Sequence, residues 1–443
     1  MTSVPRAICD LRKTMADGVT RPSELAEEAL ARANRNAGHN TYLWQDPAWT
    51  RAEAARAEAI PRGAGGEFGD GRSALWGIPT AVKDCFDLAG APTTCGVRFY
   101  RDLNGAAARD SWLVEQLRAA GAVITGKTHL HALAYGITGE NREFGDCVQP
   151  GRPDALTGGS SSGAAASVIE GSAMAAIGTD TGGSVRVPAA LCGLAGYRST
   201  LGRGNWRGGA HLAESFDTLG WIFRDLRDAP LLAWPFADSS VENGIGDALI
   251  FKRFAYIADS FLGDCEPEVK EGFHGVIREL EGLGLESRCI EPSWWAEALD
   301  IFAPIQASEA AKIHAGHFEN GNFSNVEASI CDRLKWGASL TAQELAELRK
   351  RHAEFRARMD DLFAEHELLL LPCTPVARLE AGADHSQTRA RLLRYTAPFS
   401  LAGVPTVAIP CAHGGAQLAA MRNRDEALLE LAAQIGEGRR SGS

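Results

Sequence analysis

The sequence predicts a single large α/β domain. Between residues 75 and 170, short apolar runs typical of buried strands alternate with helical stretches, which is the order of a wrapped α/β sheet. Two further strand-like runs, at 367–372 and 404–410, indicate that the tail returns to the same core. Neither an internal repeat nor a low-complexity linker divides the 443 residues, so we expect one unit rather than two separable domains.

The beginning of the chain is helical in pattern. Leu25, Ala29 and Ala33 recur at helical spacing and follow a proline and an acidic residue of the kind that favours a first helical turn. We therefore expect an N-terminal helical layer over about residues 1–60.

The middle of the chain carries the alternation itself. Residues 75–84 form a buried strand that becomes polar at its end, where Lys83 lies. A helix at 110–120, a strand at 122–127 and a helix of small residues at 163–170 follow. Functional residues in such sheets gather where strands end.

The sequence pattern changes between about residues 235 and 365. Longer amphipathic helices dominate this segment, including 342–363 with its charged faces. We expect this variable helical segment to cover the sheet and the substrate site. Residues 436–443 are predicted to be a disordered tail.

Composition excludes several classes of function. The chain has 56 acidic and 45 basic side chains and a formal charge of −11, so it lacks the positive field that gathers nucleic acid or anionic lipid. No stretch reaches the roughly 18 apolar residues of a membrane span, and residues 1–20 lack the apolar core of a signal peptide. Ten scattered cysteines without a C-x-x-C pair favour reduced thiols. We expect a cytoplasmic protein with no cofactor and no metal.

Two glycine-rich loops carry the most specific chemistry. Residues 157–163 and 178–186 place hydroxyls among glycines, and Ser160 and Ser184 lie 24 positions apart. Glycine allows close approach of the backbone, so such a serine lies beside amide groups that can stabilise an oxyanion. Taken separately, either loop also fits an ordinary turn.

A serine nucleophile needs a base to remove its proton. The obvious histidines lie elsewhere in the sequence, whereas a lysine kept neutral by burial can take this role. Lys83, at the end of an apolar strand, is the candidate, although by itself it also fits an ion pair with Asp84.

In this order, the motifs resemble the amidase signature family of serine hydrolases, and within it short amidases similar to indole-3-acetamide hydrolases. The resemblance covers the first half densely and the tail more thinly, through residues 77–84, 158–163, 178–189, 215–220 and 398–405. It implies an α/β fold in which helices cover both faces of a central mixed sheet. It also implies hydrolysis of the C–N bond of a linear amide through an acyl-enzyme.

The resemblance assigns roles to individual residues. Ser184 is then the nucleophile, Ser160 the bridging serine that follows a cis peptide bond, and Lys83 the base. The implied oxyanion hole consists of the backbone N–H groups of four successive residues, Thr181, Gly182, Gly183 and Ser184. Ser161 is expected to support Lys83, while Asp180 and Arg186 hold the nucleophile loop in shape.

Pocket residues are less clearly indicated. Tyr135, Gly136 and Ile137 align with residues that border the scissile bond in relatives, and two departures from the family pattern, at Thr157 and at 129–132, affect the shape of the pocket. Six aromatic residues are candidates for an apolar entrance: Trp206, Trp221, Trp294, Trp295, Phe302 and Phe318. They favour a small neutral aryl or aryl-alkyl amide, with a carbamate (urethane), anilide or ester as open alternatives.

Other interpretations of the sequence remain open. The pairs His129-x-His131 and His314-x-x-His317 have spacings that a metal-dependent amidohydrolase can use. The chain also resembles the amidase-type subunit of a glutamine-dependent amidotransferase, which would need a partner, and a homodimer is open. A phosphate-binding loop is weaker, because neither glycine loop ends in Gly-Lys-Ser/Thr.

Overall fold

A large mixed sheet runs through the molecule. The computed structural model describes residues 7–61, 73–233, 251–318 and 320–441. Its eleven-stranded sheet has the order β1-β3-β2-β6-β8-β7-β13-β14-β11-β9-β10. The strands are β1 (Tyr42–Trp44), β2 (Pro79–Lys83), β3 (Val123–Thr128), β6 (Ala175–Asp180), β7 (Ala195–Arg198), β8 (Thr218–Phe223), β9 (Arg253–Ile257), β10 (Glu286–Ile290), β11 (Leu368–Pro372), β13 (Thr406–Pro410) and β14 (Gly415–Ala420). The predicted single α/β domain is confirmed.

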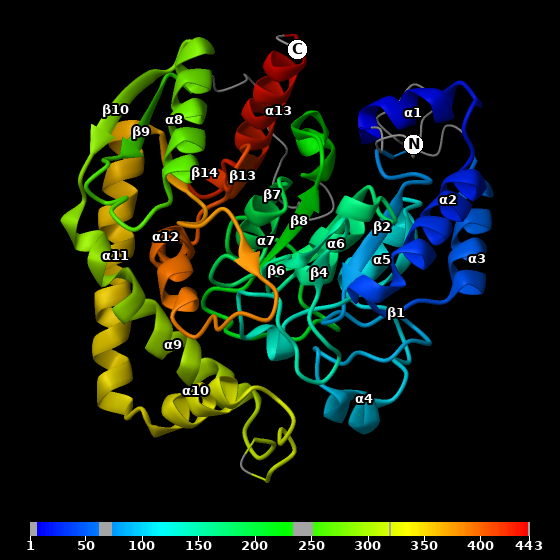
Figure 1. Ribbon diagram of the computed structural model, residues 1–443, viewed down its shortest axis with the longest axis horizontal. Coiled ribbons are helices and arrows are strands. Elements are labelled where there is room, and N and C mark those ends of the chain that lie inside the picture. Colours follow the sequence, from blue (N-terminus) through cyan, green and yellow to red (C-terminus); the bar gives the residue numbers. More distant parts are fainter. Residues whose placement is uncertain (1–6, 62–72, 234–250, 319, 442–443) are drawn as a thin grey trace.

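Helices pack along both faces of this sheet (Figure 1). They are α1 (Ile8–Ala16), α2 (Pro22–Arg35), α3 (Pro47–Glu58), α4 (Arg98–Asn104), α5 (Trp112–Ala119), α6 (Ser162–Glu170), α7 (Arg186–Leu191), α8 (Pro267–Gly282), α9 (Ala298–Ile313), α10 (Ala328–Ser339), α11 (Ala342–His366), α12 (Thr388–Ala402) and α13 (Asp425–Ser441). A small second sheet has the order β12-β5-β4, with β4 (Val148–Gln149), β5 (Arg152–Leu156) and β12 (Leu379–Glu380). In the described residues, none of these helices is long and apolar enough to cross a membrane.

Two of the expected helical regions also contain strands. The N-terminal region holds α1 to α3 together with β1, which pairs antiparallel with β3. The segment from 235 to 365 holds α8 to α11 and also β9 and β10, which pair parallel to each other at one end of the sheet. The sequence pattern did not reveal β10 because this edge strand is mostly exposed and carries the polar run Glu-Ser-Arg.

The predicted disordered tail requires correction. Helix α13 continues to Ser441, so residues 436–441 are helical, and 442–443 lie outside the described residues. The helix is held because Leu428, Leu429 and Ile435 are buried in the main hydrophobic cluster. Near its end, Arg439 pairs with Glu279 of α8 at 2.8 Å. Glycines at 436 and 438 lower helix propensity, but the tertiary contacts outweigh this effect.

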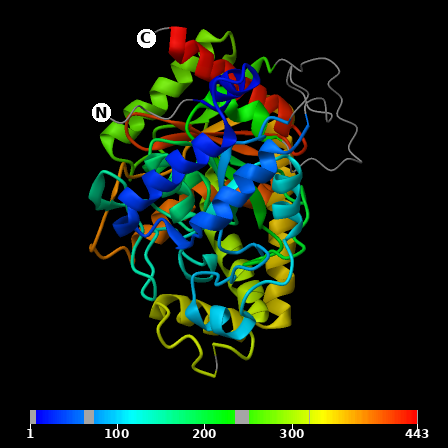
Figure 2. The ribbon, with the colours of Figure 1, turned by 90° about the vertical axis from the view of Figure 1, so that its right-hand side faces the viewer.

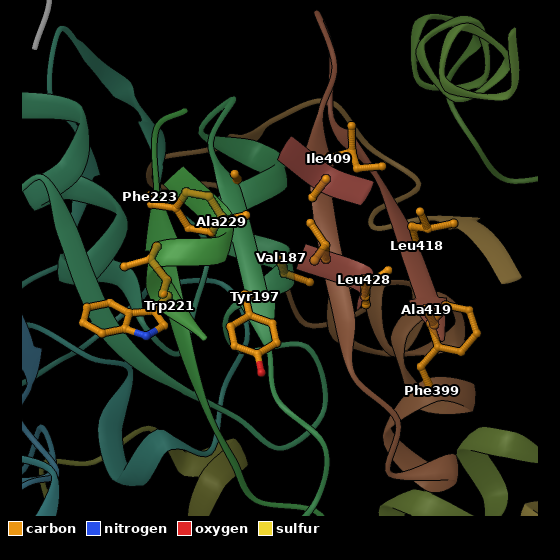
Figure 3. Packing of buried hydrophobic residues seen from close by; sticks show 14 of the residues in the cluster. Val187, Tyr197, Trp221, Phe223, Ala229, Phe399, Ile409, Leu418, Ala419 and Leu428 are labelled. Carbon is orange, nitrogen blue, oxygen red and sulfur yellow. The ribbon is translucent and has the colours of Figure 1, made fainter. Parts of the chain in front are cut away.

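The core surrounds the strands that carry the glycine-rich loops. Every residue of β2, β6, β7 and β8 is buried, and the side chains of Tyr197 and Trp221 lie on paired positions of β7 and β8 (Figure 3). A separate cluster joins Val97 and Tyr135 to Ile330 and Leu334 of α10. Phe99 and Tyr100 of α4 pack against this cluster, and Figure 2 shows α4 and α10 at the same end of the molecule. The sheet thus presents its strand ends beneath a cover of later helices.

All ten cysteines are free, in agreement with their spacing. Their thiols form no disulfide framework, so the fold depends on the hydrophobic core rather than on cross-links.

Candidate active site

Lys83 ends the buried strand β2 and meets three hydroxyl groups there. Its Nζ lies 2.8 Å from Ser160 Oγ, 3.0 Å from Ser161 Oγ and 2.7 Å from Thr179 Oγ1. The side chain is 0% exposed. Removal from water disfavours the ammonium form, so burial lowers the pKa of Lys83 to about 8. The amine is therefore poised to exchange a proton with a bound hydroxyl near neutral pH.

Asp84 does not neutralise this lysine. Its carboxylate instead pairs with the buried Lys127 at 2.6 Å and accepts the backbone N–H of Thr94 at 3.0 Å. The ordinary ion pair that the sequence allowed for Lys83 is therefore formed by another lysine. Lys83 is left with neutral hydroxyl partners.

The serine loop between β5 and α6 brings Ser160 to the lysine. The peptide bond between Gly159 and Ser160 is cis. The neighbouring segment holds the loop on both sides, since Gly159 N–H donates to Ile137 O at 2.8 Å and His131 N–H donates to Ser160 O at 3.2 Å. Ser161 fulfils its expected position, because its Oγ contacts Lys83 while its N–H donates to Ser184 O at 3.2 Å.

Glycine at 178 allows this loop to lie directly on β6. A Cβ placed there would come within 2.7 Å of Ser161 Oγ, which a real side chain essentially never does. The two glycine-rich loops are therefore brought together by the close approach of the segment that enters α6 to strand β6. The spacing of 24 residues between Ser160 and Ser184 spans this helix and strand.

The nucleophile loop follows β6 and is organised by Asp180. Its carboxylate accepts N–H groups from Gly183 at 2.8 Å and Val185 at 3.2 Å, and it pairs with Arg186 at 2.8 Å and Arg198 at 2.9 Å. Burial by itself would raise the pKa of Asp180, but the two guanidinium groups outweigh burial and hold this pKa well below its usual range. Asp180 and Arg186 thus occupy the structural positions expected of them.

One member of the expected oxyanion hole requires correction. The N–H of Gly183 donates to Asp180 and is not directed at a substrate. Within the part of the chain that the structure describes, no protein acceptor takes the N–H of Thr181, Gly182 or Ser184. Three of the four predicted donors are therefore available to a developing negative charge.

Ser184 opens onto a small pocket. The residues that line it are Ala134, Tyr135, Gly136, Ile137, Gly182, Ser184, Gln306, Arg389 and Leu393. All three predicted pocket residues are among them. Its volume is about 10 Å³, roughly the room that one water needs, so side chains must move to admit an amide.

The sequence pattern did not reveal the pocket residues from the later helices. Gln306 lies on α9, and Arg389 and Leu393 lie on α12. Both helices lie more than 100 positions after Ser184, and their polar pocket residues interrupt otherwise ordinary helical patterns. No local motif marks these positions.

None of the six aromatic residues expected at an apolar entrance is part of the lining of this pocket. Trp221 and Trp295 belong to the buried core, Trp206 stacks on His211, and Trp294 packs against Phe355. Phe302 and Phe318 are also buried, the latter in the cluster with Tyr135. None of the six lines the small pocket beside Ser184, because these large aromatic side chains pack in or against the hydrophobic clusters. Tyr135 supplies the aromatic surface of the pocket.

The two histidine pairs do not assemble a metal centre. His129 contacts Ser162 Oγ at 2.9 Å and Gly145 O at 2.8 Å, and His314 contacts the hydroxyl of Tyr100 at 2.6 Å. Burial lowers the pKa of His129 to about 4, so its ring is neutral. Among the residues described, no group of three or more histidine, cysteine, aspartate or glutamate side chains could hold a metal ion.

Comparisons with known proteins identify the family of the chain. The family model described as Amidase matches residues 24–429. A solved structure described as a crystal structure of amidase has a TM-score of 0.85 and 28% identity, covering 98% of this chain and 100% of that one. The fold and the match define an enzyme class, the hydrolases that act on the C–N bonds of amides.

Curated relatives extend the match over nearly the whole chain. Indoleacetamide hydrolase from Pseudomonas savastanoi is 30% identical, covering 96% of this chain and 95% of that protein. A glutamyl-tRNA(Gln) amidotransferase subunit from Roseiflexus sp. is also 30% identical, covering 96% of this chain and 94% of that protein. The chain belongs to the amidase signature family.

Proposed function

We propose that this protein hydrolyses a small amide with Ser184 as nucleophile, Ser160 as proton bridge and Lys83 as terminal base. The observation that carries the proposal is the buried contact of 2.8 Å between Lys83 Nζ and Ser160 Oγ. An amine with a pKa of about 8 in this position can both accept and return a proton at neutral pH. Family membership supports the same reaction class.

The reaction begins with attack of Ser184 Oγ on the amide carbonyl carbon. The proton of Ser184 passes to Ser160 Oγ as the proton of Ser160 passes to the neutral Nζ of Lys83. The carbonyl oxygen becomes an oxyanion, and the N–H groups of Thr181, Gly182 and Ser184 are the available donors for it. Thr179, which accepts a hydrogen bond from Lys83, keeps the amine oriented.

Collapse of the intermediate breaks the C–N bond. The leaving amine takes a proton from Ser160, which is replenished by Lys83, so the base returns to its neutral form. The acyl group remains on Ser184 as an ester. Water then attacks this ester with the same groups acting as base and acid, which releases a carboxylic acid and restores the serine.

The proposed mechanism is compatible with more than one class of substrate. A carbamate, an anilide or an ester presents a similar carbonyl to the same nucleophile, so these compounds remain within reach of the mechanism. The small neutral aryl or aryl-alkyl amide predicted from the sequence stays a proposal: its six aromatic residues lie outside the pocket lining, whereas one relative at 30% identity is named indoleacetamide hydrolase.

The amidotransferase relative suggests a second candidate, an ammonia-releasing subunit that acts with a partner. Turnover by the isolated chain separates the two. The purified chain is given simple amides, glutamine, a carbamate and an anilide, with and without a chelator, and Ser184→Ala is the matched control. Partner-free amide turnover that survives the chelator and is lost in Ser184→Ala supports the proposal. Turnover that is lost on adding the chelator but is retained in Ser184→Ala contradicts the proposal.

A further inference from the structure

Two arginines converge on the aromatic wall of the active-site pocket. The guanidinium carbon of Arg389, on α12, lies 5.7 Å from the ring centroid of Tyr135, and that of Arg333, on α10, lies 4.6 Å from it. Arg389 lines the pocket together with Ser184. Arg333 stands behind Tyr135 and donates from Nη2 to the backbone carbonyl of that residue at 2.6 Å. Two positive charges thus share one ring beside the nucleophile.

Among the residues that the structure describes, neither arginine forms an ion pair with a carboxylate. In the described ranges, no aspartate or glutamate oxygen lies within 4.0 Å of either guanidinium group, and the Nε of Arg333 is buried without a hydrogen-bond partner. The charge on Arg389 meets only a neutral amide, since its Nη2 donates to Gln306 Oε1 at 2.9 Å. By contrast, the buried Arg186 and Arg198 share the carboxylate of Asp180.

Both side chains remain cationic in this setting. Burial, followed by the nearby positive charge of Arg333, lowers the pKa of Arg389 to about 10, which still leaves it charged at neutral pH. Burial lowers the pKa of the neighbouring His131 to about 3, so its ring is neutral. Tyr135 contributes the negative face of its ring, which is a weak substitute for a carboxylate. Glu327 and Asp332 act on the charge of Arg333 from outside ion-pair distance, whereas Arg389 has no carboxylate partner among the described residues. A buried positive charge without a counter-ion is costly unless a ligand supplies the missing charge.

The remainder of the molecule does not favour anions. The chain carries a formal charge of −11, so the positive pair is a local feature and not part of a basic surface. The planar guanidinium group matches a carboxylate with two parallel hydrogen bonds.

We propose that the substrate is a small amide that carries a carboxylate a few bonds from the scissile carbonyl, and that Arg389 binds this carboxylate with Arg333 supporting it. The inference rests on the proposed function of Ser184 and refines it. On entry, the carboxylate replaces Gln306 as the partner of Arg389, and the salt bridge orients the carbonyl toward the nucleophile. Arg389 is then a specificity-determining residue and Arg333 a positioning residue.

The test compares near-isosteric substrates that differ in charge. Succinamate and glutaramate are measured against succinamide and glutaramide by ammonia release, and N-acetylglycine against N-acetylglycinamide by acetate release. We expect kcat/KM to favour the carboxylate member of at least one pair by about 10- to 100-fold, the range of one charged hydrogen bond. Arg389→Gln should lose most of this preference, mainly through KM, while Arg389→Lys should recover part of it.

A matched control lies on the same helix. Arg391 of α12 donates to Asp264 O at 2.9 Å and does not line the pocket. Arg391→Gln should therefore keep the wild-type preference, and Arg333→Gln should reduce it less than Arg389→Gln. Wild-type enzyme that hydrolyses the neutral member of every pair equally well or better overturns the inference. The same holds if Arg391→Gln and Arg389→Gln have equal effects.

Binding without chemistry separates this inference from the proposed function. Calorimetry with Ser184→Ala measures the affinity for succinamate and succinamide when acylation is impossible. Preferential binding of succinamate, lost on adding Arg389→Gln, supports the anion site even if hydrolysis is never observed. Equal binding of the two compounds overturns the anion site while leaving Ser184 catalysis on neutral amides intact.

Discussion

Lys83 Nζ lies 2.8 Å from Ser160 Oγ in a site where the lysine is fully buried and meets no carboxylate among its hydrogen-bond partners. The contact joins strand β2 to the loop before α6, so two segments separated by 77 residues must fold together to create it. Protonation of this buried amine at low pH removes its basic lone pair, so Lys83 can act as the base only in its neutral form.

This arrangement predicts the pH dependence of the reaction. Because burial lowers the pKa of Lys83 to about 8 and the neutral form is the base, kcat/KM for a neutral amide should rise with pH and level off above about 8. Rates from pH 6 to 10 check this, with an acyl substrate that carries no titrating group. A profile that is flat, or that falls between pH 6 and 8, contradicts Lys83 as the base.

The same lysine predicts a pH dependence of stability. The folded-state pKa of Lys83 is about 8, below the ordinary value of 10.5, so the unfolded chain binds more protons between these values. The free energy of unfolding contributed by this group therefore rises as pH rises through that window, by about 3 kcal/mol in total. Urea unfolding of wild type and Lys83→Met at pH 7 and pH 10 measures this. The stability of wild type relative to the variant should increase, and no change would contradict a neutral buried amine.

The two serines beside Lys83 should differ in their effects. Ser160→Ala removes the bridge and should lower kcat for amides by about 10³-fold or more, in the range seen when catalytic residues are lost. Ser161→Ala removes one hydrogen bond to Lys83 and should lower kcat by about 10-fold. Steady-state kinetics with circular dichroism as a folding control checks the order. Equal losses would contradict the assignment of Ser160 as the bridge.

Asp180 should be important for folding rather than for chemistry. Asp180→Asn leaves Arg186 and Arg198 as buried charges without their carboxylate, so it should lower the free energy of unfolding by about 3–5 kcal/mol. Asp102→Asn is the control, because its pair with Arg101 is exposed and should change stability by less than about 1 kcal/mol. Similar results from the two variants in urea unfolding would show that the buried network contributes little.

The sequence predicted the residues that carry local motifs. Lys83, Ser160 and Ser184 each lie in a glycine-rich or strand-end segment, and the structure brings these segments together at the carboxyl ends of the neighbouring strands β2 and β6. The sequence did not predict the pocket residues that reach Ser184 only through tertiary packing. Gln306 and Arg389 reach the pocket only because α9 and α12 fold back over the sheet.

Two corrections have the same origin. The N–H of Gly183 was expected to face a substrate, but it donates to Asp180, whose carboxylate also pairs with Arg186; the sequence indicated that these two residues hold the loop but not which N–H group they occupy. The aromatic entrance was inferred from residue type alone, and those side chains are used by the core. Side-chain identity thus predicted which residues of the two loops lie together better than it predicted the lining of the pocket.

The most direct measurement is intact-mass capture of the acyl-enzyme. The protein is mixed with an activated acyl ester, quenched in acid and digested, and the modified residue is located by mass spectrometry. We predict one acyl group per chain, on Ser184, absent from Ser184→Ala and formed much more slowly by Lys83→Met at pH 8. An acyl group on another residue, or equal labelling of Ser184→Ala, would contradict the account.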